Sequence, residues 1–88
     1  MRGVNKVILH DRFNVKRIGV FGSYARGDYS RQSDVDMLVE FVRPVDLFAF
    51  VRLENFLSAC LHKKVDLVTK RALKSLIKKE ILKDTIYL

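Results

Sequence analysis

Two aspartates at the start of an apolar run restrict the fold of this chain more than any other feature. The run VDMLVEFV, residues 35–42, has the length and composition of a strand and is followed by Pro44. Asp34 and Asp36 flank its first valine, so on a strand their side chains share one face, with Cα atoms about 6.5 Å apart. Two carboxylates in this position repel each other and resist leaving water. The sequence therefore predicts a compensating positive charge at that face of a sheet.

The rest of the chain alternates between apolar runs of strand length and patterns with helical periodicity. We expect strands at 17–22, 35–42, 64–69 and 85–88, and helices at 4–14, 23–27, 47–63 and 71–84. This order predicts an α/β or α+β fold in which helices flank a small mixed β-sheet. With 49% hydrophobic content in 88 residues, the chain is expected to form a single domain, residues 1–88.

Residues at the helix ends and along the helices refine this prediction. Asn14 is expected to end the first helix in a left-handed conformation, and Asp46 to cap the helix after Pro44. Apolar side chains that recur at helical spacing are expected to form the inward faces of the long and last helices. The positions at this spacing are Val4, Val7 and Ile8 in the first helix, Leu47, Phe50, Val51, Leu57, Cys60 and Leu61 in the long helix, and Leu73, Leu76, Ile77 and Ile81 in the last.

The charge of the chain is strongly positive. Seventeen lysine and arginine residues stand against ten aspartate and glutamate residues, a net charge of +7, and eight of the basic residues lie between Lys63 and Lys83. Such an excess suits an acidic protein, a phosphorylated small molecule or nucleic acid, and equally a solvated helix face. Nucleic acid is the least favoured partner because no base-stacking or groove-reading element accompanies the charge.

The chain lacks the sequence features of a membrane-spanning or secreted protein. No segment approaches the roughly 20 apolar residues of a membrane helix, and the stretch before His10 lacks the apolar centre of a signal peptide. Cys60 is the single cysteine, which excludes an internal disulfide and makes the cytoplasm the expected compartment. His10 and His62 lie far apart in the sequence, so histidine and cysteine form no competing catalytic set.

A third aspartate extends the carboxylate pair. Asp66 lies in the predicted third strand and can join Asp34 and Asp36 if the second and third strands are neighbours. Three carboxylates suit magnesium or manganese, because a divalent cation removes their repulsion. The alternative is that each aspartate pairs with a nearby arginine or lysine.

A glycine-serine pair before the aspartates supplies what a phosphate needs. Gly22 has no side chain, so a phosphate can approach its backbone closely. Ser23 follows with a hydroxyl and the unpaired N–H groups of a helix N-terminus. Arg26, one turn later, can reach a phosphate oxygen. Phosphate donors at one end and metal-binding carboxylates at the other predict a nucleotide site.

The stretch GSYARGDYSRQSDVDMLVEF resembles the signature of the DNA polymerase β-like nucleotidyltransferases, a Gly-Ser and ten intervening residues before Asp-x-Asp. Gly22-Ser23 and Asp34-Val35-Asp36 match that spacing without a gap. The variants GSYARG and SDVD, with KVDLV after one helix, resemble the minimal nucleotidyltransferase (MNT) branch, known chiefly as the antitoxin half of HEPN/MNT toxin–antitoxin pairs. The resemblance covers nearly the whole chain and implies a small nucleotidyltransferase core with a mixed sheet flanked by helices.

The resemblance also implies roles for individual residues and an activity. Asp34, Asp36 and Asp66 would hold two Mg²⁺ ions, with Mn²⁺ as an alternative, and Gly22 and Ser23 would contact the triphosphate of ATP. The implied enzyme is a protein adenylyltransferase that transfers AMP from ATP to a tyrosine of a HEPN toxin. Asp36 and Asp66 both remain candidates for the proton acceptor.

Two other functions remain open on the sequence. The chain could be a non-catalytic antitoxin that neutralises its partner by binding alone, within a homo- or hetero-oligomer. It could also be a nucleotidyltransferase that acts on a small molecule. The small size of the chain disfavours the small-molecule enzyme, because 88 residues leave no room for an acceptor-binding domain. Recognition of the acceptor is then expected to come from the partner, from a dimer, or from an exposed surface of this chain. The candidate surfaces are the basic helix at 71–83 and the Phe48/Phe56 side of the long helix.

Overall fold

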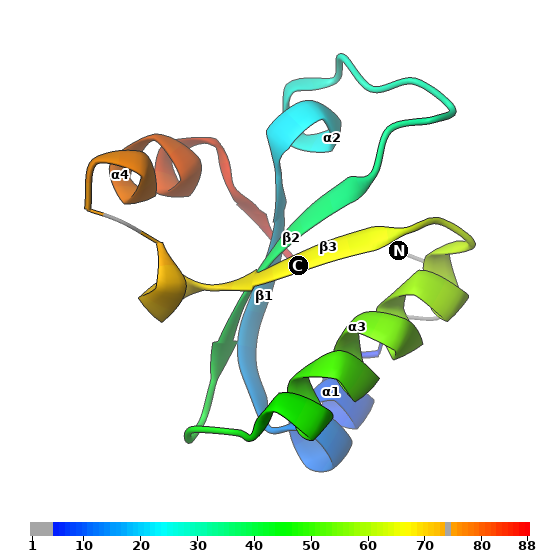
Figure 1. The fold of residues 1–88 in the computed structure, drawn as a ribbon, viewed down its shortest axis with the longest axis vertical. Helices are drawn as coiled ribbons and strands as arrows, with labels where there is room; N and C mark the ends of the chain where they lie inside the picture. Colours follow the sequence, from blue (N-terminus) through cyan, green and yellow to red (C-terminus); the bar gives the residue numbers. More distant parts are fainter. Residues whose placement is uncertain (1–4, 74) are drawn as a thin grey trace.

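The computed structural model describes residues 5–73 and 75–88, in which helices flank a four-stranded mixed sheet (Figure 1). In chain order the elements are α1 (Lys6–Phe13), β1 (Val15–Phe21), α2 (Gly22–Arg26), β2 (Val35–Phe41), α3 (Leu47–Leu61), β3 (Val65–Thr69), the 3₁₀ helix η1 (Lys70–Ala72), α4 (Ser75–Asp84) and β4 (Ile86–Tyr87). The strand order is β3-β2-β1-β4, and β2 and β3 are parallel whereas the other neighbours are antiparallel. The predicted fold class and mixed sheet are confirmed.

Most element boundaries agree with the prediction within two residues, and the main differences lie at two places. The first strand begins at Val15, and Gly22 opens α2 where the sequence placed the end of the strand. The expected last helix is divided into η1 and α4. The cause of this division is local, because the Thr69 side chain accepts a hydrogen bond from the Ala72 N–H and starts a separate short turn.

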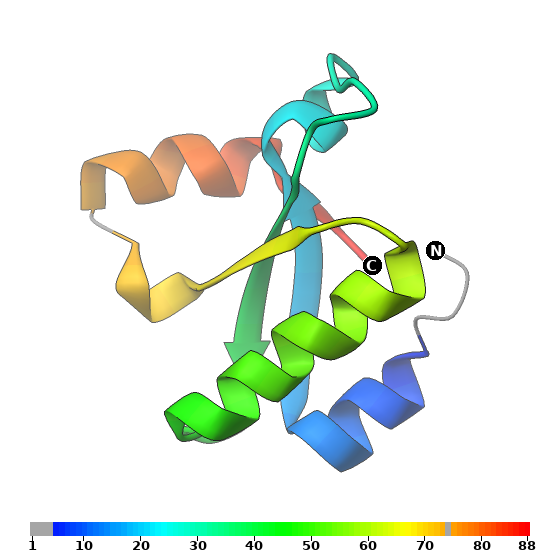
Figure 2. The ribbon, with the colours of Figure 1, turned by 45° about the vertical axis from the view of Figure 1, so that its right-hand side comes forward.

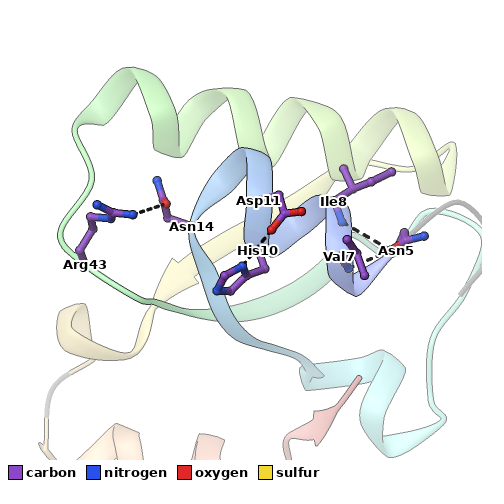
Figure 3. A network of polar contacts seen from close by, with 7 residues as sticks. All are labelled: Asn5, Val7, Ile8, His10, Asp11, Asn14 and Arg43. Carbon is purple, nitrogen blue, oxygen red and sulfur yellow. Dashed lines mark hydrogen bonds and ion pairs between the residues drawn. The ribbon is translucent and has the colours of Figure 1, made fainter.

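Both predicted helix signals act as expected. Asn14 ends α1 at φ 58°, in the left-handed conformation, and the Asp46 carboxylate caps α3 by accepting from the Ala49 N–H at 2.8 Å. Asn14 also ties α1 to the end of β2, because its backbone oxygen accepts from the Val42 N–H at 2.8 Å. Its side-chain oxygen accepts from Arg43 at 3.3 Å, and a second asparagine, Asn5, caps the start of the same helix (Figure 3).

The two faces of the sheet have different roles. Alternate residues of β2, such as Val35, Met37 and Val39, pack with α1 and α3 into one buried cluster. By strand alternation Asp36 projects from the opposite face, and α2 and α4 lie on that side of the sheet (Figure 2). The fold thus places most of the core on one face of the sheet, whereas the other face carries the carboxylates together with the fully buried Leu38.

The buried face of α3 differs from the one that the sequence predicts. Leu57 is fully buried as expected, but so is Leu53, which the predicted stripe omits. Leu47 and Val51 are exposed, and so is Ile77 of α4. The prediction was wrong because α3 carries apolar residues on more than one side, so spacing alone does not identify the buried face. No helix within the described residues is long and apolar enough to cross a membrane.

Other expected apolar positions divide between the core and its border. Phe50, Phe56 and Leu61 are partly buried against the core, and Cys60 is half-buried. Val7 of α1 is exposed, whereas its neighbour Leu9 is fully buried. Val4 and the side chain of Leu76 lie outside the described part of the structure.

The outer edge of β3 is occupied by side chains of α3. The Ser58 hydroxyl accepts from the Val65 N–H at 3.0 Å, and the Glu54 carboxylate accepts from the Leu67 N–H at 3.0 Å. These two residues of β3 therefore find partners away from β2. The strand β3, which carries Asp66, is therefore bonded to β2 on one side and to α3 side chains on the other.

Truncating Leu53 to alanine should lower the free energy of unfolding by about 3 kcal/mol, because it removes a fully buried side chain and leaves a cavity. The same substitution at Leu47, on the exposed side of the same helix, should change stability by less than about 0.5 kcal/mol. Urea denaturation of both variants measures the difference. Equal losses would mean that the face of α3 is assigned incorrectly.

Candidate active site

The sheet register brings two of the three predicted carboxylates together. Asp36 of β2 is the direct partner of Asp66 in the parallel strand β3. Paired residues of neighbouring strands project from the same face, so both side chains lie on the face opposite the core. The condition that the sequence left open, adjacency of the second and third strands, is met.

Asp34 lies immediately before β2, on the same side as Asp36 by strand alternation. Its carboxylate oxygen is 3.9 Å from the Lys64 ammonium, and both side chains are largely in solvent. An exposed pair at this distance contributes little energy. Lys64 was not foreseen as part of the site, and the Lys63-Lys64 pair just before β3 was the signal that could have indicated it.

The glycine-serine turn directly contacts Asp36. Gly22 has φ +70° at the start of α2, and a Cβ built there would overlap the Asp36 carboxylate. The missing side chain of Gly22 thus makes room for Asp36 and brings the glycine-serine turn beside a candidate metal ligand. Ser23 follows on α2, and its hydroxyl has no hydrogen-bond partner among the described residues. The structure thus places the two predicted halves of the site side by side.

Arg26 lies at the end of α2, where it is 3.3 Å from the Asp28 carboxylate. It is also close enough to Asp36 to lower the pKa of that carboxyl, although other effects are larger. Lys70 is another basic residue that could add positive charge near a phosphate. It lies near the opposite end of β2, 3.4 Å from Glu40. Of these two cations, Arg26 is the one near the carboxylates.

The electrostatics of Asp36 are unfavourable for a charged carboxylate. Burial raises the pKa of Asp36 above its ordinary value of 3.8, and the negative charges of Asp66 and then Asp34 raise it further. The weaker influence of Arg26 acts in the opposite direction. Neither Asp36 nor Asp66 has an ion-pair partner among the described residues. This uncompensated negative charge is what a bound divalent cation would neutralise.

The donor chemistry at this face fits magnesium. Aspartate oxygens are the ligands that Mg²⁺ prefers, and the ion usually keeps positions for water and substrate phosphates. In the described residues, no three His, Cys, Asp or Glu side chains are already gathered as a ready metal site. The Asp34 carboxylate instead lies 3.9 Å from the Lys64 ammonium.

Two tyrosines and a lysine border the site on the α2 side. Tyr24 and Tyr29 stack with ring centroids 4.3 Å apart, and the Tyr24 hydroxyl is buried without a hydrogen-bond partner in the described residues. Lys63 donates to the Arg31 carbonyl at 3.0 Å and lies 5.9 Å from the Tyr24 ring. These contacts hold the loop between α2 and β2, which delivers Asp34 and Asp36.

Comparison with known proteins identifies the family. A sequence model of the nucleotidyltransferase domain matches residues 6–88. The chain belongs to this nucleotidyltransferase family. The protein adenylyltransferase MntA of Thermococcus cleftensis is 48% identical over 83 residues, which are 94% of this chain and 84% of that protein. The chain is therefore an enzyme of the nucleotidyltransferase class.

Solved structures agree with the fold of this nucleotidyltransferase. A chain described as a candidate minimal nucleotidyltransferase superposes with a TM-score of 0.81 at 35% identity, covering 93% of this chain and 84% of the other. The structure of a tri-AMPylated Shewanella oneidensis HEPN toxin in complex with an MNT antitoxin matches with a TM-score of 0.65 at 27% identity, covering 94% and 66%. The MNT branch that the motif resembles is thereby shown.

Replacing Asp66 with asparagine should lower the pKa of Asp36. The substitution removes the negative charge with the larger effect on the pKa of Asp36, while burial, the largest cause, remains. Titration of the metal-free protein by carboxyl ¹³C NMR would follow Asp36 in both proteins. In the parent, protonation is expected above pH 3.8, and in Asp66→Asn at a lower pH than in the parent. An unchanged titration midpoint of Asp36 would mean that Asp66 does not interact with it and is not part of the site.

Proposed function

We propose that this nucleotidyltransferase transfers AMP from ATP to a tyrosine hydroxyl of a HEPN-type partner and so acts as its antitoxin. The observation that carries the proposal is the contact of the Gly22 backbone with Asp36, in register with Asp66. The MntA relative is named a protein adenylyltransferase, and the Shewanella oneidensis complex pairs an AMPylated HEPN toxin with an MNT antitoxin. ATP as the donor is consistent with activity in the cytoplasm.

The site residues have two roles in the reaction, which are binding the triphosphate and holding the cations that neutralise its charge. Gly22 and Ser23 receive the triphosphate, and Arg26 adds positive charge near the carboxylates. Asp34, Asp36 and Asp66 would hold two Mg²⁺ ions, or Mn²⁺, which supply charge neutralisation on the phosphoryl oxygens and acidify the acceptor hydroxyl when bound.

The transfer itself exchanges one bond to phosphorus for another. The acceptor oxygen forms a bond to the α-phosphorus of ATP, the bond to the bridging oxygen breaks, and pyrophosphate leaves. The hydroxyl proton passes to a carboxylate, and Asp36 and Asp66, which are paired in register, are both candidates to accept it.

A direct assay tests the proposal. The purified chain, ATP, Mg²⁺ and the HEPN-type product of the neighbouring gene are incubated together, and the partner is weighed by intact mass spectrometry. We expect the partner to gain the mass of one or more AMP groups, and the gain to disappear with a chelator. A partner that stays unmodified, while Asp36→Asn protects cells as well as the parent does, would favour neutralisation by binding. AMP on a small alcohol and none on the protein would favour a small-molecule enzyme.

A further inference from the structure

The end of the sheet away from the carboxylates carries exposed apolar side chains. Where β2 leads into α3, Val42, Leu47, Phe48 and Val51 are exposed, Leu47 and Phe48 by 73% and 74%. We call these four residues the β2–α3 surface. Beside them lies an open hollow of about 750 Å³ that extends to η1 and α4. Large apolar side chains gathered at one place on a small, highly charged chain indicate a contact surface.

The rim of the hollow is basic. Arg43, Lys70, Arg71 and Lys78 line it together with two carboxylates. Both carboxylates are already engaged, because Glu40 lies 3.4 Å from Lys70 and 3.7 Å from Arg17, and Asp46 caps α3. In the described part of the chain, no carboxylate forms an ion pair with Arg43, Arg71 or Lys78. The rim therefore presents uncompensated positive charge.

The exposed apolar side chains and the basic rim together indicate which kind of protein can bind at this surface. A second copy of the chain would bring two basic rims together, and each copy already carries a net charge of +7. An acidic segment with apolar side chains would instead bury Phe48 and Leu47 and place its carboxylates against the rim. Charge complementarity thus favours a different, acidic protein over self-association.

We propose that the β2–α3 surface is the docking site for an acidic amphipathic segment of the protein that accepts the nucleotidyl group. This inference rests on the proposed function. The two sites lie at opposite ends of β2, whose seven residues span about 20 Å. Docking at one end holds the partner while the carboxylate end stays open for its hydroxyl. The partner's hydroxyl then reaches the site at a high effective concentration.

Binding measurements with matched variants test the docking site. The probe is the purified HEPN-type product of the neighbouring gene, titrated calorimetrically without ATP. Phe48→Ser should weaken binding about tenfold or more, because it removes an exposed aromatic anchor. Ile86→Ser, which also removes an exposed apolar side chain but lies on β4, is the control and should leave binding within about twofold.

Charge reversal gives a second, independent test. Arg71→Glu/Lys78→Glu should weaken binding and reduce its dependence on salt, because both residues line the hollow. Arg71→Glu/Lys79→Glu is the matched control, since Lys79 is next to Lys78 on α4 but does not line the hollow. It should bind more tightly than the first pair. Circular dichroism melting of each variant verifies that the fold is retained.

The outcomes separate docking from catalysis. Tight binding that Phe48→Ser weakens, with no AMP transferred, would refute the proposed function and still support docking here. Unchanged binding of both Phe48→Ser and Arg71→Glu/Lys78→Glu would overturn the docking site, whether or not AMP is transferred. Failure of the parent chain to bind the probe would also overturn it. So would a dimer of the parent chain, seen by sedimentation, that Phe48→Ser dissociates.

Discussion

Asp36→Asn is expected to slow nucleotidyl transfer about a thousandfold or more, the largest effect of any single substitution in this chain. Asparagine keeps the shape of the side chain but removes the charge that would hold a divalent cation next to Asp66. It also removes one of the two candidate proton acceptors. Transfer to the partner, followed by intact mass over time, measures the rate. Activity within tenfold of the parent would remove Asp36 from the chemistry.

The same substitution should make the protein more stable at pH 7. Burial and the neighbouring carboxylates raise the pKa of Asp36, so the folded state binds this proton more tightly than the unfolded chain does. The ionised carboxylate therefore opposes folding at neutral pH, and this penalty disappears as the pH falls through the raised pKa. The gain in melting temperature of Asp36→Asn should accordingly be present at pH 7 and shrink on acidification.

A control on the opposite side of the sheet makes the comparison specific. Asp11→Asn changes an exposed aspartate of α1, next to His10 and remote from the α2 side of the sheet (Figure 3). It should leave transfer unchanged. Loss of activity in both variants would point to a general effect of charge and not to the site.

Gly22→Ala should reduce transfer about a hundredfold or more through displacement of Asp36. Alanine places a Cβ where the Asp36 carboxylate lies, so the carboxylate must move. A displacement of about 1 Å in a catalytic group is enough for such a loss of rate. The left-handed backbone at φ +70° should also lower stability by about 1–2 kcal/mol. Transfer assays and urea denaturation measure the two effects separately.

Gly27→Ala isolates the clash from the backbone strain. Gly27 ends α2 at φ +82°, also left-handed, but a Cβ there would meet no atom within 4 Å. Its substitution should therefore lower stability by a similar amount while transfer stays within about threefold of the parent. If both alanine variants lose activity equally, strain in α2 and not contact with Asp36 would be the cause.

Features of the site that depend on local periodicity could be predicted from the sequence. Strand alternation places Asp34 and Asp36 on one face, and a parallel neighbour strand of the expected length brings Asp66 beside them. Gly22 signals a close backbone approach wherever it follows a buried strand. These features require only the pleat of a strand and the sterics of one residue, so the fold preserves them.

Features that depend on tertiary contacts could not be predicted in the same way. Leu53 is buried and Leu47 exposed because α3 meets the sheet at one particular angle, and helical spacing does not encode that angle. The contact between Lys64 and Asp34 joins residues thirty positions apart and appears once β3 lies beside β2. Even so, the roles of the three aspartates toward Mg²⁺ remain predictions that the assays above can test.

The hydrogen bonds from α3 to β3 have a consequence for how this protein behaves at high concentration. An uncovered outer strand offers its backbone to any passing chain and so invites polymerisation. Here Ser58 and Glu54 occupy two of those backbone donors. These bonds should therefore hinder the pairing of another chain with β3, and loss of the Glu54 carboxylate should make the protein more prone to aggregate.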